Sequence, residues 1–184
     1  MRIESVESFL IRDAYVVRIT TDSGVSGIGQ TACWGYPEAV AEVIARFRPW
    51  LIGRDPLQIE HIHQFLYRMA PFRGSVLSGS VAAIDIALWD LKGKHFDTPV
   101  WQLLGGKVRD TIRLHLLMGG GNDEEIRKKA AESRDEGFTA VKIDPLPNNF
   151  HSMTLSRLIS DTRDTVAALR EGAGLDVDII LEIH

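Results

Sequence analysis

The second part of the 184-residue chain alternates between strand-like and helix-like segments, and this alternation limits the folds it can adopt. Residues 111–118, 139–144 and 178–184 are short apolar runs rich in β-branched residues, which are typical of strands. Residues 124–136 and 155–170 have helical periodicity, and glycines follow both segments. The order strand, helix, strand, helix, strand predicts a parallel α/β arrangement, because parallel strands need long crossover connections.

The first part of the chain predicts a different architecture. Residues 1–11, 14–20 and 25–32 indicate three strands, and Asp22-Ser23-Gly24 provides a tight turn between two of them. In the third strand, Gly27 and Gly29 indicate bends or a close approach of another backbone. Helices follow from Pro37, ended by Pro49 and Gly53, then over 56–67 and over 75–94, the last with a broad apolar stripe. This pattern predicts an α+β domain.

We therefore expect an α+β domain over residues 1–110, followed over residues 111–184 by the opening units of an α/β barrel. The predicted strands are too few to close a (β/α)₈ barrel, which usually takes about 250 residues. The barrel is expected to be incomplete after its third strand, which would leave that strand unpaired on one side. We expect the chain to associate with itself or with another chain through this edge, or to aggregate, and we expect a homo-oligomer.

Composition excludes several classes of partner. Lys+Arg 21 against Asp+Glu 25, a net charge of −4 without a long run of one sign, gives no basic footprint for nucleic acid. No stretch approaches the roughly 18 apolar residues of a membrane span, and Glu4 and Glu7 interrupt any signal-like segment. The single cysteine, Cys33, excludes an internal disulfide and suits a reducing compartment, so we expect a cytoplasmic protein.

Polar residues cluster toward the carboxyl ends of two predicted parallel strands. Strand alternation places Lys142 and Asp144 on one face, and Glu182 and His184 on one face of the following strand. Catalytic residues of α/β barrels lie at this end, and a base, a carboxylate and an imidazole together suit metal binding with proton transfer. The alternative is a structural Lys–Glu salt bridge beside a solvated histidine, and the pattern alone leaves both open.

Other polar residues are weaker candidates. His61 and His63 are two apart on a predicted helix, so they cannot share a metal ion. The glycines at 119–121 lack the spacing of a dinucleotide- or phosphate-binding loop and indicate a connector. Trp34 and Tyr36, in a Gly/Pro loop, either cap a small ligand or pack beneath the loop.

Three segments carry a family resemblance. Residues 79–106 (GSVAAIDIALWDLKGKHFDTPVWQLLGG) resemble the helix and connection that join the capping domain to the barrel in the mandelate racemase/muconate lactonizing enzyme branch of the enolase superfamily. Residues 22–30 (DSGVSGIGQ) are similar to that family's capping-domain hairpin, with Gln30 where glutamate is more usual, and residues 137–142 (GFTAVK) resemble its second barrel strand. The matching segments follow one another in the family's order.

The resemblance implies a two-domain enzyme whose barrel holds Mg²⁺. Glu182 matches the first of three metal-binding carboxylates, where aspartate is commoner, and His184 looks like the general acid of galactonate-dehydratase-like members. Lys142 matches the first lysine of a Lys-x-Lys motif. Asp144 replaces the second lysine, which argues against a racemase and leaves Asp144 as a substrate contact beside Trp34 and Tyr36.

The activity implied is that of a Mg²⁺-dependent acid-sugar dehydratase acting on a small sugar acid. The alternatives are an epimerase or cycloisomerase of the same superfamily, or a non-catalytic remnant that serves as an interaction module. One carboxylate does not satisfy Mg²⁺, which requires several oxygen ligands in octahedral geometry. Residues 1–184 are therefore expected to be inactive by themselves.

Overall fold

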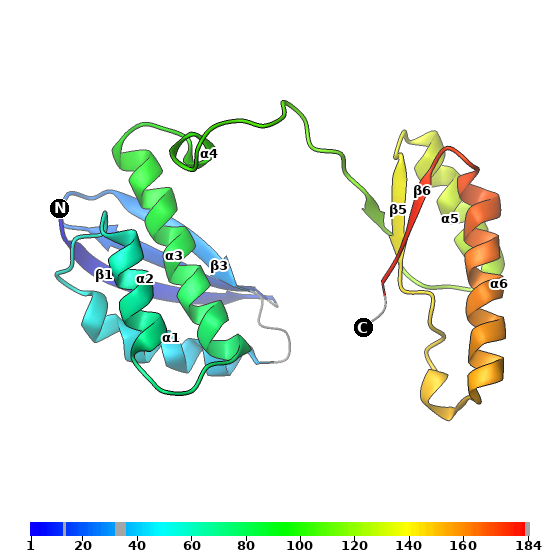
Figure 1. Cartoon of the computed structure of the whole chain (residues 1–184), viewed down its shortest axis with the longest axis horizontal. Coiled ribbons are helices and arrows are strands. Elements are labelled where there is room, and N and C mark those ends of the chain that lie inside the picture. Colours follow the sequence, from blue (N-terminus) through cyan, green and yellow to red (C-terminus); the bar gives the residue numbers. More distant parts are fainter. Residues whose placement is uncertain (13, 32–35, 183–184) are drawn as a thin grey trace. The chain divides into compact units, whose positions relative to one another are not determined.

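The chain forms two compact units, Met1–Val108 and Arg109–His184. The structure is a computed structural model that describes residues 1–12, 14–31 and 36–182. Ribbon colours in Figure 1 follow the sequence through both units.

The first unit is built on a three-stranded antiparallel sheet, in the order β1 (Ile3–Ile11), β2 (Ala14–Thr21) and β3 (Ser26–Thr31). Alternate β2 residues point to opposite faces, so Val17 and Ile19 are fully buried while Arg18 is exposed. The predicted turn after β2 is confirmed, because Gly24 adopts a φ of 81° and its N–H donates to the Thr21 carbonyl over 2.9 Å.

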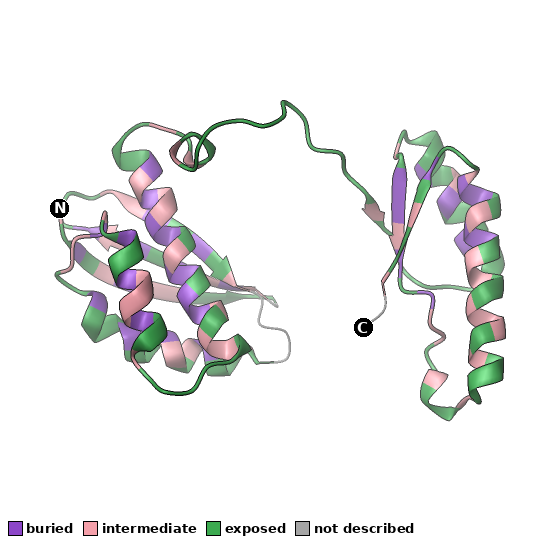
Figure 2. Ribbon diagram, viewed as in Figure 1, coloured by how far each residue is buried: buried purple, intermediate pink, exposed green. Residues whose placement is uncertain are grey.

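Helices α1 (Pro37–Leu51), α2 (Ile59–Arg68) and α3 (Ser75–His95) cover one face of this sheet, and the short α4 (Val100–Leu103) follows (Figure 1). Their buried faces join those of the strands in one core, as the purple segments of Figure 2 show. The largest fully buried side chains of this core are Ile3, Ile19, Ile44, Leu51, Ile62, Leu66, Ile84, Leu88 and Leu91. The sequence prediction of an α+β unit is confirmed.

One helix end agrees with the prediction and one helix start differs from it. Helix α1 ends at Leu51, between Pro49 and Gly53, and the Ile52 N–H then donates to the Arg48 carbonyl. Helix α2 begins at Ile59 rather than residue 56, because Asp55 accepts a hydrogen bond from the Leu57 N–H (3.0 Å) in a local turn.

The third strand packs directly on α3. A Cβ built on Gly27 would lie 2.0 Å from the Ala87 carbonyl oxygen, so the predicted close approach is confirmed. At the outer edge of β3, the Ile28 N–H donates to Asp90 Oδ2 over 2.8 Å. Lys94 Nζ donates to the same Asp90 oxygen (2.7 Å) and to the Ser26 carbonyl (3.1 Å). The helix therefore satisfies backbone groups that an edge strand would otherwise expose.

The second unit holds a three-stranded parallel sheet in the order β4 (Leu116–Leu117), β5 (Ala140–Ile143) and β6 (Asp178–Leu181). Helices α5 (Asp123–Asp135) and α6 (Leu155–Ala173) connect these strands and lie together on one side of the sheet (Figure 1). Their core is Met118, Ile126, Ala130, Val141, Ile143, Leu169, Ala173 and Val177. The predicted order of strands and helices is confirmed.

The first and last of these strands are shorter than predicted. Only Leu116 and Leu117 of the predicted segment 111–118 belong to β4, and residues 111–115 are exposed. Strand β6 ends at Leu181, although the Glu182 N–H still donates to the Ile143 carbonyl over 2.9 Å. The hydrophobic pattern of a segment shows which residues can form a strand. The number of residues that pair depends on the neighbouring strands of the folded sheet.

None of the helices in the described ranges is long and apolar enough to cross a membrane.

Candidate functional site

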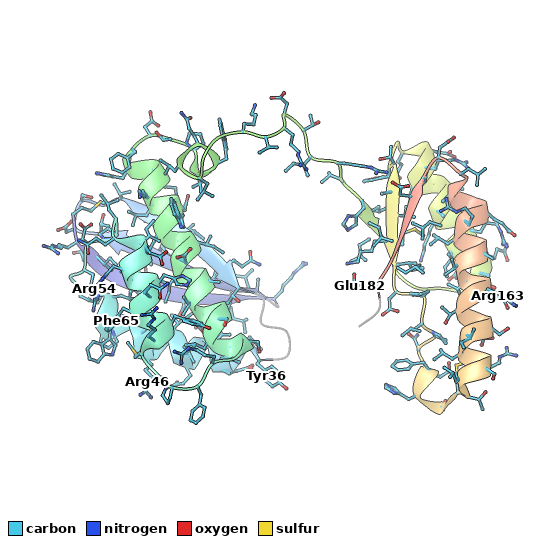
Figure 3. The ribbon with its side chains drawn as sticks, in the orientation of Figure 1. Tyr36, Arg46, Arg54, Phe65, Arg163 and Glu182 are labelled. Carbon is cyan, nitrogen blue, oxygen red and sulfur yellow. The ribbon has the colours of Figure 1, made fainter. Side chains whose placement is uncertain are left out.

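Lys142 and Glu182 form an ion pair at the carboxyl end of the parallel sheet. Lys142 lies in β5 and Glu182 directly follows β6, and Figure 3 shows Glu182 where β6 ends. The two side chains are 27% and 26% exposed, respectively. The structural salt bridge of the sequence analysis requires this contact, and the functional interpretation is compatible with it.

Strand alternation explains why the pair lies on the uncovered face. Val141 and Ile143 of β5 are fully buried against the helices, so Lys142 between them points to the other side. The register places Lys142 beside Leu117 and Ile180, which are also exposed. The face opposite α5 and α6 therefore carries the polar residues, and this is the face that a closed barrel would turn inward.

Asp144 lies one residue beyond β5 and is exposed. One of its carboxylate oxygens accepts a hydrogen bond from the Leu146 N–H over 3.1 Å. This hydrogen bond lies at the start of the loop that leads to the 3₁₀ turn Phe150–Ser152. Asp144 thus shapes the connection at the same end of the sheet as Lys142 and Glu182. Its predicted contact with substrate stays a prediction.

Tyr36 belongs to the first unit, where it immediately precedes α1. Its carbonyl accepts a hydrogen bond from the Val40 N–H (3.3 Å), and the residue is 63% exposed (Figure 3). Trp34 and His184, the other predicted site residues, lie outside the described residues. Their assigned roles, in substrate contact and in proton transfer, remain predictions.

The metal-ligating side chains of the described residues are too few for Mg²⁺. Within residues 1–12, 14–31 and 36–182, no group of three or more His, Cys, Asp or Glu residues could hold a metal ion. Glu182 supplies one carboxylate, which fits one position of an octahedral site. The described residues therefore do not complete a Mg²⁺ site, and the remaining oxygens would have to come from elsewhere.

Arg113 is a positioning residue that the sequence analysis did not identify. Its guanidinium donates to Thr139 Oγ1 (2.7 Å) and to the Thr139 carbonyl, and it pairs with the Asp178 carboxylate at 2.7 Å. Thr139 precedes β5 and Asp178 begins β6, so Arg113 ties the amino ends of the two strands whose carboxyl ends carry Lys142 and Glu182. No periodicity marks Arg113, because its partners are distant in the sequence.

Two histidines of the first unit have ordinary structural contacts. His63 Nδ1 lies 3.1 Å from Asp85 Oδ1, which joins α2 to α3. His61 Nε2 lies 3.4 Å from the guanidinium of Arg54, which in turn stacks on Phe65 (Figure 3). The two imidazoles have separate partners, Arg54 for His61 and Asp85 for His63.

Comparison with known proteins identifies close relatives. The chain is 36% identical over 172 residues to a D-galactonate dehydratase from Klebsiella pneumoniae (strain 342), a match that covers 91% of this chain and 44% of that protein. The structure superposes with a TM-score of 0.90 on an enolase-superfamily member from Salmonella Typhimurium, at 29% identity over all of this chain and 55% of that one. It also resembles the 3,6-anhydro-D-galactonate cycloisomerase from Zobellia galactanivorans (TM-score 0.85, 29% identity, 98% of this chain and 50% of that one).

The chain thus spans about half the length of the relatives that it matches. Residues 5–105 match the family described as "Mandelate racemase / muconate lactonizing enzyme, N-terminal domain". The first unit is the α+β capping domain of that family, and the second contains the opening strands and helices of an incomplete barrel. The chain belongs to the mandelate racemase/muconate lactonizing enzyme family of the enolase superfamily.

Proposed function

We propose that the protein to which these residues belong is a Mg²⁺-dependent acid-sugar dehydratase. The observation that carries the proposal is the meeting of Lys142 and Glu182 at the carboxyl end of the parallel sheet. The 36% identity to a D-galactonate dehydratase supports dehydration as the reaction and a sugar acid as the substrate. Fold alone would not support either, because one fold hosts many reactions.

Each predicted site residue has a role in this proposal. Glu182 would donate one carboxylate to the ion, which would supply positive charge that stabilises the anion formed from the substrate. Lys142 stabilises the negative charge that develops on that carboxylate as the α-proton leaves. Tyr36, Trp34 and Asp144 contact the sugar. The base that removes the α-proton lies outside residues 1–184.

His184 is proposed as the general acid. The electron pair of the broken α C–H bond forms a double bond to the β-carbon, and the β-hydroxyl leaves with a proton from His184 as water. Proton transfer of this kind typically contributes about 10²–10⁴-fold to the rate. The enol product then takes a proton at the β-carbon and loses the proton of the hydroxyl on its α-carbon, which gives a 2-keto-3-deoxy acid, so the net change is the loss of one water molecule.

The experiment is a screen of hexonates and pentonates with the protein as its complete reading frame encodes it, with Mg²⁺ or with EDTA. We expect a 2-keto-3-deoxy acid only with Mg²⁺, and a loss of at least about 10²-fold in kcat for His184→Asn. His61→Asn removes an exposed imidazole of α2 and is the matched control, with unchanged turnover. Absence of turnover on every acid sugar would refute the proposal.

Residues 1–184 alone are proposed to be inactive, since Glu182 cannot hold Mg²⁺ in octahedral geometry by itself. Purified protein of this length is expected to release no product from any sugar acid that the complete protein dehydrates. Turnover by residues 1–184 with added Mg²⁺ would contradict the proposal that this part of the protein has too few oxygen ligands to hold the ion.

The second candidate function is epimerisation or cycloisomerisation, which the likeness to a cycloisomerase favours. Both begin with removal of an α-proton, so exchange of that proton in D₂O without loss of water would identify them. Asp144 argues against a racemase, because a carboxylate stands where a second lysine base would be needed. A non-catalytic interaction module would show neither exchange nor elimination.

A cytoplasmic location and a homo-oligomeric state are part of the proposal. The reducing compartment suits a chain with the single cysteine Cys33. Residues 1–184 by themselves would self-associate through the outer edge of β6, to which no other described strand pairs.

A further inference from the structure

We propose that the capping domain contains a binding site for a small monocarboxylic acid with an apolar body, of the kind found in medium-chain fatty acids. The site is a hollow of about 540 Å³ between α1, the end of α2 and the start of α3. This volume lies within the range of about 300–1,000 Å³ that small-molecule sites occupy. The inference does not depend on the dehydratase proposal, because the residues that line the hollow belong to the first unit.

The inner surface of the hollow is apolar. Phe47 and Leu66 line it and are 2% and 0% exposed. Partly buried side chains that pack against the same core also line it, namely Val43, Met69, Val76 and Leu77. Such a surface favours a ligand whose body leaves water on binding. It disfavours a polyhydroxylated sugar acid, because the hydroxyl groups would lose hydrogen bonds to water without replacement.

Phe72 gives the hollow an aromatic surface that the capping domain leaves uncovered. It belongs to the loop between α2 and α3, lines the hollow and is 86% exposed. Aromatic side chains provide a large apolar contact area when a ligand covers them. The apolar body of a bound acid would therefore shield the Phe72 ring from water.

Arg46 brings a positive charge to the hollow. It lies three residues after Val43 and next to Phe47, so the helical period places all three on the side of α1 that lines the hollow (Figure 3). Within residues 1–12, 14–31 and 36–182, no carboxylate forms an ion pair with the Arg46 guanidinium. The group can therefore pair with an anionic ligand without first leaving an internal partner.

Arg73 supplies a second guanidinium, which is already restrained at the hollow. Its Nη1 donates to the Ala70 carbonyl, and its Cζ lies 4.8 Å from the centroid of the Tyr67 ring. Neither contact neutralises the charge, and no Asp or Glu is among the described residues that line the hollow. Carboxylates accept strong, charge-assisted hydrogen bonds from guanidinium groups. Two cations beside an apolar surface therefore match a ligand that joins one carboxylate to an apolar body.

The test is a calorimetric titration of the full chain with three probes. Octanoate has a carboxylate and an apolar body, octanol has a body of the same length without the charge, and acetate has the charge without the long body. We expect octanoate to bind roughly tenfold more tightly than octanol, because only octanoate accepts charge-assisted hydrogen bonds from the two arginines. Acetate should bind at least as weakly as octanol, since it buries little apolar surface.

Variants locate the site. Arg46→Met/Arg73→Met should weaken octanoate binding by roughly tenfold and leave the octanol affinity within twofold. Arg48→Met removes the same charge from an exposed position of the same helix, outside the hollow, and should change neither affinity. Met69→Gln puts an amide on the apolar surface and should weaken octanoate and octanol alike. Circular dichroism of each variant establishes that the capping domain is folded.

Equal affinities for octanoate and octanol would overturn the inference. An octanoate affinity of Arg46→Met/Arg73→Met within twofold of the unchanged chain would overturn it as well, because the acid would then bind elsewhere. Light scattering tests the other occupant, a second copy of the chain. If octanoate does not bind and the double arginine variant self-associates less than the unchanged chain, the hollow is an interface between copies and the assignment to a small acid is wrong.

Discussion

Gly29 of β3 lies so close to Ala83 of α3 that a Cβ on the glycine would stand 1.9 Å from the Ala83 carbonyl oxygen. Gly27 makes the same kind of approach to Ala87 one helical turn further along. The long helix of the capping domain therefore rests on the backbone of the strand, not on side chains. Neither backbone can move away alone, because α3 also packs against α1 and α2 in the common core.

The first prediction is that Gly29→Ala destabilises the capping domain by about 3 kcal/mol, since the added methyl overlaps backbone atoms that cannot rotate aside. The measurement is the free energy of unfolding in urea. Gly120→Ala adds the same methyl where no atom lies within 4 Å, and should change it little. Equal effects of the two substitutions would contradict the close packing of β3 on α3.

The second prediction concerns the hydrogen bond that Asp90 accepts at the outer edge of β3. Asp90→Ala removes the acceptor of the Ile28 N–H and the partner of Lys94. Because Asp90 is 34% exposed, water replaces part of the lost interaction, and we expect a destabilisation of about 1 kcal/mol. Glu42→Ala, which removes an exposed carboxylate of α1, serves as the control in the same thermal unfolding experiment. A loss of stability no larger than that of Glu42→Ala would contradict the stabilising role of Asp90 at this edge.

The third prediction is that Arg113 contributes more through Thr139 than through Asp178. The Arg113–Asp178 pair is 56% and 70% exposed, so Asp178→Asn should cost less than about 0.5 kcal/mol. Arg113→Ala also removes both hydrogen bonds to Thr139 and should cost about 1–2 kcal/mol. Hydrogen exchange of β5 and β6 amides reports both changes. Similar effects of the two variants would assign the stabilisation to the ion pair instead.

The fourth prediction concerns the outer edge of β6, which no other strand in the described part of the chain pairs with. Leu181 is 42% exposed at this edge, and an unpaired apolar strand edge invites pairing with another chain. We expect residues 1–184 to self-associate in light scattering, and Leu181→Lys to shift the population toward monomer. A monomeric unchanged chain would show that this edge is not an interface.

Sequence patterns predicted most of the elements that the structure contains. The three- and four-residue spacing of apolar residues located α1 and α3, and the run of short apolar segments located β5 and β6. The glycines of β3 were predicted to mark bends or a close approach of another backbone, and the packing on α3 confirms the close approach. Element ends were less predictable, as the start of α2 and the short β4 illustrate.

The sequence by itself determined the order of the elements, the burial of Val141 and Ile143, and the position of Lys142 and Glu182 at strand ends, because these depend on local periodicity and on chain order. Only the tertiary structure decided that the Lys142 ammonium contacts Glu182, that Arg113 joins Thr139 to Asp178, and that Asp90 caps Ile28. Each of these contacts joins residues distant in sequence. Such contacts form only when packing sets the register and separation of whole elements, which no local pattern encodes.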